Sequence, residues 1–257
     1  MFFVNGVLLS FLILSAGIHA QEVDLKFYEK RLISQNGEDG VIEKIFKVIG
    51  ITNKYYVEFG AGDGHFGSNT KYLREKHQWK GLLLDGFYSE NQSINLHNEF
   101  ITAENIADLF RKYEVPADFD LISIDIDRND FYVWKELNRF YRPRVVIIEC
   151  NPYFKVDEDK VIRYSANDIW DASQHFGSSA LALFTLGRTL GYSLVYQDSS
   201  GMNLFFIRDD VLPACNDTFK SINNIGELYV AQSEYELDQK IVDEKFISSE
   251  EALRRFE

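Results

Sequence analysis

Residues 55–67 read YYVEFGAGDGHFG, an apolar run that carries one acid and then opens into a glycine-rich turn. The apolar part predicts a buried strand of a parallel sheet. The glycines lack Cβ atoms, so backbone N–H groups in the turn can approach a ligand closely. Glu58, inside the strand, offers a carboxylate to polar or cationic parts of that ligand. The stretch therefore predicts a strand that delivers its ligand-binding turn to one edge of a sheet.

The spacing Glu-x-Gly-x-Gly-x-Gly favours S-adenosylmethionine as the ligand of this turn. The same letters contain Gly62-x-Gly64-x-x-Gly67, a dinucleotide fingerprint, with Asp85 at the distance of a ribose-binding acid. In the dinucleotide interpretation the motif would begin one step late along the turn, and Glu58 would have no role. A glycine turn that serves only packing is the third alternative. We expect the methionine-bearing nucleoside at these residues: Glu58, Gly60, Ala61, Gly62, Asp63 and Gly64.

The remainder of the chain alternates strand and helix patterns. Strands are predicted at 55–59, 82–85, 99–103, 119–126 and 144–150, with helices at 41–49, 69–76, 88–97, 106–113 and 130–140. Repeated strand-helix units predict a parallel sheet covered by helices on both faces, with ligands at the carboxyl ends of the strands. After an irregular stretch at 151–176, a helix at 178–190 precedes two strands, 192–196 and 202–208, joined by a glycine-containing turn, which predicts a hairpin.

We therefore predict an α/β, Rossmann-like class I methyltransferase fold: a mostly parallel seven-stranded sheet with a C-terminal antiparallel hairpin. The hairpin is an observation independent of the glycine turn. Residues 21–212 form the predicted methyltransferase-like domain, and the polar residues 213–257 an acidic, helical or partly disordered tail.

The first 20 residues are almost uninterruptedly apolar and end at a small residue before a polar chain, which predicts a secretory signal peptide. An uncleaved signal anchor is the alternative, because no Lys or Arg precedes the apolar run. We expect a protein that is secreted or in the secretory-pathway lumen, with no membrane contact after cleavage. Two cysteines provide no disulfide framework. The net charge of −13 argues against nucleic acids and anionic membrane surfaces as partners.

Polar residues follow the other strands of the predicted sheet. Asp85 ends GLLLDG, where its carboxylate can accept hydrogen bonds from ribose hydroxyls or cap the next turn. Glu104 and Asn105 follow the third predicted strand, where an adenine would be contacted, although Glu104 suits a solvated loop equally well.

An acidic group follows the fourth predicted strand in SIDIDRND, at Asp125, Asp127 and Asp130. Such a group is repulsive unless a proton, a cation or a cationic ligand offsets it, and the sulfonium of the methyl donor is one candidate. A divalent cation is another, with oxygen ligands from Glu149 and Asn151 in ECNP. Helix capping and pairing with Arg128 are the structural alternatives.

Four side chains are the candidates for removing a proton from the methyl acceptor: Asp125, Asp127, Glu149 and His175. His175 precedes an apolar helix, and its ordinary pKa suits a general base near neutral pH, although a capping or surface histidine is equally consistent. Aromatic residues at 132, 134, 153, 154 and 170 can shape an acceptor pocket or belong to the core.

Several ordered motifs resemble the FkbM-like methyltransferase family, within it the branch that includes the insect Star protein domain. They span Ser34–Asp210: SQNGED, YVEFGAGDG with SNT, GLLLDG, SIDIDRNDFYVW, VVIIECNP, HFGSSALAL, LGRTLGYSLVY and GMNLFFIRDD. The resemblance implies S-adenosylmethionine as donor, O-methylation of a small molecule or glycan, and these cofactor residues: Glu58, Gly60, Gly62, Asp63, Asn69, Asp85 and Asp125. Arg128 stands where relatives commonly have glycine, and a cation there could enter the acceptor site or neutralise Asp127.

Two other functions remain open from the sequence. The Star-like branch is associated with secretory trafficking of other proteins, so a catalytically inactive binding module that keeps the fold is the second hypothesis. A nicotinamide-dependent oxidoreductase, with a dinucleotide in the glycine turn, is the third.

Overall fold

The computed structural model describes residues 22–212, 218–231 and 236–256. The predicted signal peptide lies outside these residues, as does Cys215. Within them no helix combines the length and the apolar character needed to cross a membrane. The Cys150 thiol is buried and donates a hydrogen bond to the carbonyl of Gly201.

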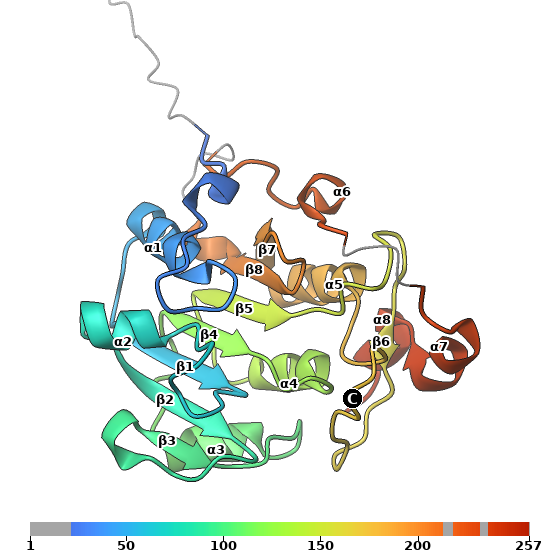
Figure 1. Cartoon of the computed structure of the whole chain (residues 1–257), viewed down its shortest axis with the longest axis horizontal. Helices are drawn as coiled ribbons and strands as arrows, with labels where there is room; N and C mark the ends of the chain where they lie inside the picture. The colour runs from blue at the N-terminus through green and yellow to red at the C-terminus, as the bar shows by residue number, and fades with distance from the viewer. Residues whose placement is uncertain (1–21, 213–217, 232–235, 257) are drawn as a thin grey trace, which may run out of the picture.

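A seven-stranded sheet in the order β3-β2-β1-β4-β5-β8-β7 forms the centre of the protein (Figure 1). The first five strands in this order are parallel, and β8 runs antiparallel to both β5 and β7. This order confirms the predicted class I methyltransferase Rossmann-like fold. The strands are β1 (Tyr55–Phe59), β2 (Lys80–Asp85), β3 (Leu96–Asn98), β4 (Leu121–Ile124), β5 (Val145–Glu149), β7 (Tyr192–Gln197) and β8 (Asn203–Arg208).

Alternating side chains of the strands fill two apolar layers. Val57 and Phe59 of β1 point into the layer beneath α3, α4 and α5, whereas Tyr56 points into the layer beneath α1 and α2. Both faces are buried, which explains why the parallel strands appear in the sequence as continuous apolar runs. The main helices are α1 (Glu38–Ile49), α2 (Lys71–His77), α3 (Ile106–Lys112), α4 (Asp130–Leu137) and α5 (Ala180–Leu190).

The third strand and the segment before it differ from the prediction. The helix expected at 88–97 is replaced by a 3-10 turn, η2 (Gln92–Ile94), and the strand expected at 99–103 lies earlier, as β3. The Asn91 side chain accepts from the backbone N–H of Ser93, and Asn95 adopts a left-handed conformation with φ of 56°. Asparagines that bond to nearby backbone compete with helix formation, so this asparagine-rich stretch turns instead.

The tail returns to the domain and pairs with the stretch that follows β5. Its strand β9 (Phe246–Ile247) forms a small antiparallel sheet with β6 (Val161–Ile162), a strand that the sequence pattern did not indicate. Helix α8 (Ser249–Leu253) packs on α5, and α6 (Ile225–Leu228) and α7 (Gln239–Lys245) complete the tail. Figure 1 shows the tail in red beside the yellow segment near the carboxyl ends of the strands. Short 3-10 turns, η1 (Leu25–Tyr28) and η3 (Asp209–Val211), contribute Leu25 and Val211 to the apolar layer beneath α1 and α2.

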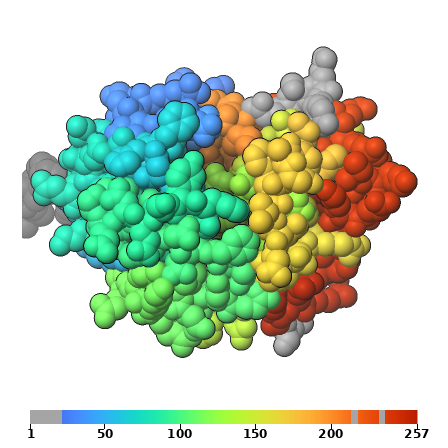
Figure 2. All heavy atoms as spheres, turned by 60° about the horizontal axis from the view of Figure 1, so that its bottom comes forward, coloured from blue at the N-terminus to red at the C-terminus, as the bar shows by residue number. Residues whose placement is uncertain are grey.

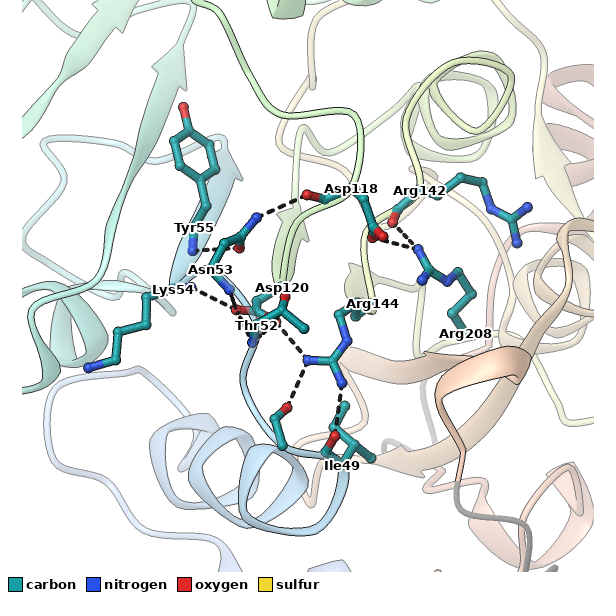
Figure 3. A network of polar contacts seen from close by, with 11 residues as sticks. Ile49, Thr52, Asn53, Lys54, Tyr55, Asp118, Asp120, Arg142, Arg144 and Arg208 are labelled. Carbon is teal, nitrogen blue, oxygen red and sulfur yellow. Dashed lines mark hydrogen bonds and ion pairs between the residues drawn. The ribbon is translucent and has the colours of Figure 1, made fainter.

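A buried ion pair fastens the opposite, amino-terminal edge of the parallel strands (Figure 3). Arg144 lies 2.7 Å from the carboxylate of Asp120, and the same carboxylate accepts hydrogen bonds from the backbone N–H groups of Thr52, Asn53 and Lys54. Arg144 also donates to the carbonyls that end α1. The loop between α1 and β1 is thereby fixed to β4 and β5, away from the glycine turn.

Candidate functional site

The glycine turn after β1 has the backbone conformation that its sequence predicts. Gly60, Gly62 and Gly64 have φ of 58°, 57° and 72°, in the left-handed region that favours glycine. Ala61, between them, donates its N–H to the carbonyl of Leu84 on the neighbouring strand. A Cβ at Gly62 would meet no atom closer than 3.9 Å, so the missing side chain leaves open space beside the turn.

Glu58 holds the loop that follows the turn. Its oxygens accept hydrogen bonds from the hydroxyls of Ser68 and Thr70 and from the backbone N–H of Asn69, at 2.7, 2.5 and 2.7 Å. Burial raises the pKa of Glu58, while these donors act in the opposite direction. Asn69 in turn donates its side-chain amide to Ser123 of β4. The structure therefore gives Glu58 and Asn69 the task of positioning the loop beside the turn.

Asp85 fixes the two turns that meet at the end of β2. One carboxylate oxygen accepts from the N–H of Gly62 at 2.8 Å, and the other accepts from the N–H groups of Phe87 and Tyr88 at 2.8 and 3.1 Å. The side chain is buried but lines a cavity at the carboxyl ends of the strands. Asp85 thus organises the glycine turn and also borders the space where a ligand would lie.

This cavity, which we call the strand-end cavity, has a volume of about 630 Å³ and runs from β2 across β1 and β4 to β5. Its size lies in the range of cavities that hold cofactors. In Figure 2 the green segment and the yellow segment face one another across a hollow. Six of the predicted site residues line the cavity: Gly60, Gly62, Asp85, Asp125, Asp127 and Glu149.

Most of the remaining lining residues of the strand-end cavity come from the loops that follow the strands and from the stretch after β5. Trp170 is one of the aromatic residues that the sequence offered for a pocket, but sequence reasoning did not identify these lining residues: Gln35, Gly86, Phe87, Tyr88, Glu99, Phe100, Ile101, Ile126, Asn129, Asp168, Ile169 and Met202. The early end of β3 accounts for Glu99, Phe100 and Ile101, because the chain leaves the sheet after Asn98.

Seven predicted cofactor residues do not line this cavity: Glu58, Ala61, Asp63, Gly64, Asn69, Glu104 and Asn105. Asp63 is exposed and accepts from the backbone N–H groups of His65 and Phe66, which closes a local turn. Glu104 accepts a hydrogen bond from the hydroxyl of Tyr164. Asn105 accepts from the N–H of Thr102 at 2.8 Å and donates to the carbonyl of Phe100 at 2.8 Å. Their contacts in the structure stabilise the turns around the cavity.

The acidic residues converge as the sequence predicts. Carboxylate oxygens of Asp125, Asp127 and Glu149 lie within 4.8 Å of one another, a group that could hold a metal ion. Burial, then the neighbouring carboxylates, raises the pKa of Asp125 and Glu149 well above the usual range. Glu149 is buried, and its Oε2 atom has no hydrogen-bond partner among the described residues. A shared proton or a bound cation would satisfy this group.

The turn at Asp127 and the neighbouring Asp130 shape the backbone and the charge of the group. Asp127 has φ of 65°, and the N–H of Arg128 donates across it to the carbonyl of Ile126, which forms a tight turn at the cavity. A left-handed conformation in a residue other than glycine is uncommon and concentrates at functional sites. Burial raises the pKa of Asp130 to about 7, and its Oδ1 atom accepts from the N–H of Ile126.

Arg128 forms its ion pairs with the stretch after β5. Its guanidinium lies 2.5 Å from Asp168 and 3.9 Å from Asp171. The sequence left open whether this cation neutralises Asp127, and the ion pairs show that its direct partners are the two later aspartates. Arg128 therefore ties the loop after β4 to the wall of the cavity.

His175 lies in a buried segment that Asn151 holds in place. The Asn151 amide donates to the carbonyls of Gln174 and Phe176, at 2.7 and 2.9 Å. His175 is buried and its Nε2 atom has no hydrogen-bond partner among the described residues. It lines neither the strand-end cavity nor the smaller cavity beside it. The carboxylates, rather than His175, border the space where an acceptor would lie.

The smaller cavity, of 180 Å³, shares Asp127, Glu149, Trp170 and Met202 with the strand-end cavity. Tyr153 and Phe176 add aromatic surface to it. Among the described residues that line it there is no lysine, arginine or histidine. The two cavities therefore meet at the acidic group, and the smaller one offers ring surfaces and carboxylates to a second molecule.

No protein-family model matches the chain, and no curated protein sequence matches it. Solved structures with a similar arrangement include an O-methyltransferase family protein from Burkholderia thailandensis, at 9% identity and a TM-score of 0.36 over 66% of this chain and 57% of that one. They include MycE methyltransferase from the mycinamycin biosynthetic pathway, in complex with Mg and SAH, at 14% identity and a TM-score of 0.42 over 67% of this chain and 50% of that one.

A third similar structure is an S-adenosylmethionine-dependent methyltransferase from Clostridium acetobutylicum, at 11% identity and a TM-score of 0.33 over 72% of this chain and 92% of that one. The match spans little more than half of the first protein and half of the second. These similarities are too distant to assign an activity, and the fold class rests on the strand order of the sheet. The chain is distantly similar in structure to S-adenosylmethionine-dependent methyltransferases.

Proposed function

We propose that this protein binds S-adenosylmethionine in the strand-end cavity and methylates an oxygen of a small molecule or glycan. The observation that carries the proposal is the joint position of the glycine turn, Asp85 and the acidic group around one cavity. Gly62 leaves open space where a side chain would project, and Asp85 holds the turn in the conformation that leaves it open. The motif resemblance to the FkbM-like family and the apolar first 20 residues support a methyltransferase of the secretory-pathway lumen.

The bound donor would supply the methyl group, and the residues of the chain would position the acceptor and remove its proton. Transfer to an oxygen depends mainly on the alignment of the two reacting molecules. Asp127 lies where the two cavities meet, and burial raises its pKa, which makes its carboxylate a better proton acceptor near neutral pH. The aromatic and acidic lining of the smaller cavity favours an uncharged, ring-bearing acceptor over an anionic one.

A divalent cation is a second candidate occupant of the acidic group, since Asp125, Asp127 and Glu149 supply the hard oxygen ligands that such ions prefer. The unpartnered Oε2 atom of Glu149 favours this idea. Titration with Mg²⁺ and Mn²⁺, with and without Asp127→Asn, tests it directly. Binding of either ion that Asp127→Asn weakens would support a cation site. If neither ion binds, a proton shared between the carboxylates is the explanation that fits the group.

Calorimetric titration with S-adenosylmethionine and S-adenosylhomocysteine tests the cofactor, with NAD as the competing ligand. We expect micromolar binding that Asp85→Ala weakens at least about tenfold. Asp120→Asn is the matched control, because Asp120 also accepts from three backbone N–H groups but lies at the opposite edge of the sheet. The control is expected to lose stability and retain binding.

The outcomes separate the three hypotheses. Donor binding followed by methylation of a sugar or alcohol in an acceptor screen would support the proposal. Donor binding without turnover would favour the inactive binding module, and binding of NAD alone would favour the oxidoreductase. Absence of binding of every nucleotide would contradict a cofactor role for the cavity.

A further inference from the structure

A cavity separate from the strand-end cavity and the smaller cavity lies between η1, α1 and α2, on the opposite side of the sheet from α3, α4 and α5. Its volume is 560 Å³, and it shares no lining residue with the strand-end cavity. Lys54 and Trp79, which line it, directly precede β1 and β2, so it lies toward the amino ends of these strands. We call it the lysine-rimmed pocket, after Lys44, Lys47 and Lys54. The proposed methyl transfer gives it no task.

The floor of the lysine-rimmed pocket is apolar and firmly packed. Phe46, Leu73 and Trp79 are each at most 4% exposed, and the rings of Phe46 and Trp79 meet edge to face at 4.9 Å. At the opening, Ile51 is 48% exposed and Tyr28 is 40% exposed. The pocket thus continues from a rigid apolar floor to apolar side chains that water still reaches, which is the surface that an apolar ligand would cover.

The rim carries positive charge on a chain whose net charge is −13. Lys44 and Lys47 lie three residues apart on α1 and so on one side of the helix. The Lys44 ammonium lies 4.6 Å from the centre of the Tyr28 ring, and that of Lys54 donates to the carbonyl of His77. None of the three lysines has an ion pair with a described acid.

The acid at the rim already has a partner. Glu43 lies 3.1 Å from the Nε2 atom of His77. The ammonium groups of Lys44 and Lys47 are consequently available to an anion that enters from solvent, while the strongly negative chain as a whole would repel a polyanion. One anionic group joined to an apolar body fits both observations.

We propose that the lysine-rimmed pocket binds a small amphiphile, with an alkyl or aromatic body on Phe46, Leu73 and Trp79 and a single carboxylate or phosphate at Lys44 and Lys47. The proposal does not depend on methyltransferase activity. The anionic group exchanges its hydration for charge-assisted hydrogen bonds, and the body removes the exposed apolar surface of Ile51 from water.

Calorimetry with decanoate, below its micelle concentration, tests the proposal on the whole protein. Decanol and decyltrimethylammonium match its chain length without the negative charge. We expect saturable binding of one decanoate, weakened about tenfold in the Lys44→Gln/Lys47→Gln double variant. Lys76→Gln is the control, because Lys76 is an exposed residue of α2 that does not line the pocket. All variants should unfold at the wild-type temperature.

Three results would overturn the proposal. The first is no binding of decanoate, and the second is equal binding of the neutral or cationic chain. The third is competition by S-adenosylhomocysteine, which would place decanoate in the strand-end cavity. Vesicles containing phosphatidylserine separate the free amphiphile from a membrane surface: binding to vesicles without binding to decanoate also contradicts the proposal.

Discussion

Gly60 faces the backbone carbonyl of Asp125, so closely that a Cβ on Gly60 would lie 1.6 Å from that oxygen. The end of β1 and the end of β4 can approach to this distance only because residue 60 has no side chain. The contact brings the glycine turn and the acidic group to one cavity. It is therefore the packing relationship on which the arrangement of the candidate site depends.

Gly60→Ala should destabilise the protein by more than about 3 kcal/mol, because the methyl group would have to displace backbone. Gly62→Ala is the matched control: its φ of 57° is equally unfavourable for alanine, but no atom lies within 3.9 Å of the added Cβ. The control should cost only about 1 kcal/mol of unfolding free energy, from backbone strain. Urea denaturation of both variants measures the difference, and equal losses would show that the close contact is unimportant.

The parallel strands and the fold class could be predicted from the sequence because each parallel strand is an apolar run followed by a polar turn. The same logic placed Asp85, Asp125, Asp127 and Glu149 at one edge of the sheet, since these residues directly end strands or follow them. These positions depend only on where an apolar run ends, and the local pattern located the ends of β1, β2, β4 and β5 to within two residues.

The rest of the site depends on contacts between segments far apart in the chain. Trp170 and Asp168 reach the cavity from a stretch with no periodic pattern, held through Arg128. Strand β6 has two residues and forms by pairing with β9, more than 80 residues later. Such short strands have no signal of their own, because their stability comes from the partner rather than from local propensity.

The ion pair of Asp120 and Arg144 should make stability depend on acid pH. Burial raises the pKa of Asp120, but hydrogen bonds from Arg144, Thr52 and the backbone of Lys54 outweigh it, so the pKa is lowered overall. The stabilisation is thus present above the ordinary carboxyl pKa of 3.8 and is lost as the pH falls through the folded-state value. Asp120→Asn should cost about 3–5 kcal/mol at pH 7, because it leaves Arg144 buried without a charged partner.

The cost of Asp120→Asn should become smaller below pH 3.8, where the wild-type carboxyl is itself protonated in the unfolded chain. Denaturation at pH 7 and pH 3 measures both values. Asp108→Asn, in an exposed pair on α3, provides the control and should change stability little at either pH. A cost that is the same at both pH values would exclude the ion pair as its source.

Asp130 should make stability fall as the pH rises, which is the opposite of the effect of Asp120. Its pKa is raised to about 7 by burial, so the folded state favours the protonated form, and its contribution to stability is lost as the pH rises from 3.8 to about 7. Asp130→Asn keeps an oxygen for the N–H of Ile126 and cannot ionise. The variant should therefore gain a few kcal/mol relative to the wild type between pH 5 and pH 8. Parallel stability curves for the two proteins would contradict the raised pKa.

The tail should control the acceptor side of the site through Phe246. This residue of β9 is 3% exposed and packs edge to face on Phe154, with ring centres 5.0 Å apart. Beside it, Arg163 donates its backbone N–H to the carbonyl of Lys245, and the Lys245 ammonium pairs with Asp171. The tail thereby fastens the stretch that supplies Trp170 to both cavities.

Phe246→Ala should lower the free energy of unfolding of the segments that pack around Phe246 by about 3–5 kcal/mol, as large-to-small substitutions in a core do. The loss should appear as faster hydrogen exchange over 151–176 and the tail, with the sheet unchanged, because the affected apolar cluster is separate from the two main layers. Phe140→Ala, at an exposed phenylalanine after α4, is the control and should leave exchange at the wild-type rate.

Kinetics of the two variants test the role of the tail in the site. If the tail only covers the domain, both variants will bind and methylate an acceptor equally. If it positions the wall of the smaller cavity, Phe246→Ala will raise KM for the acceptor and leave binding of the donor intact.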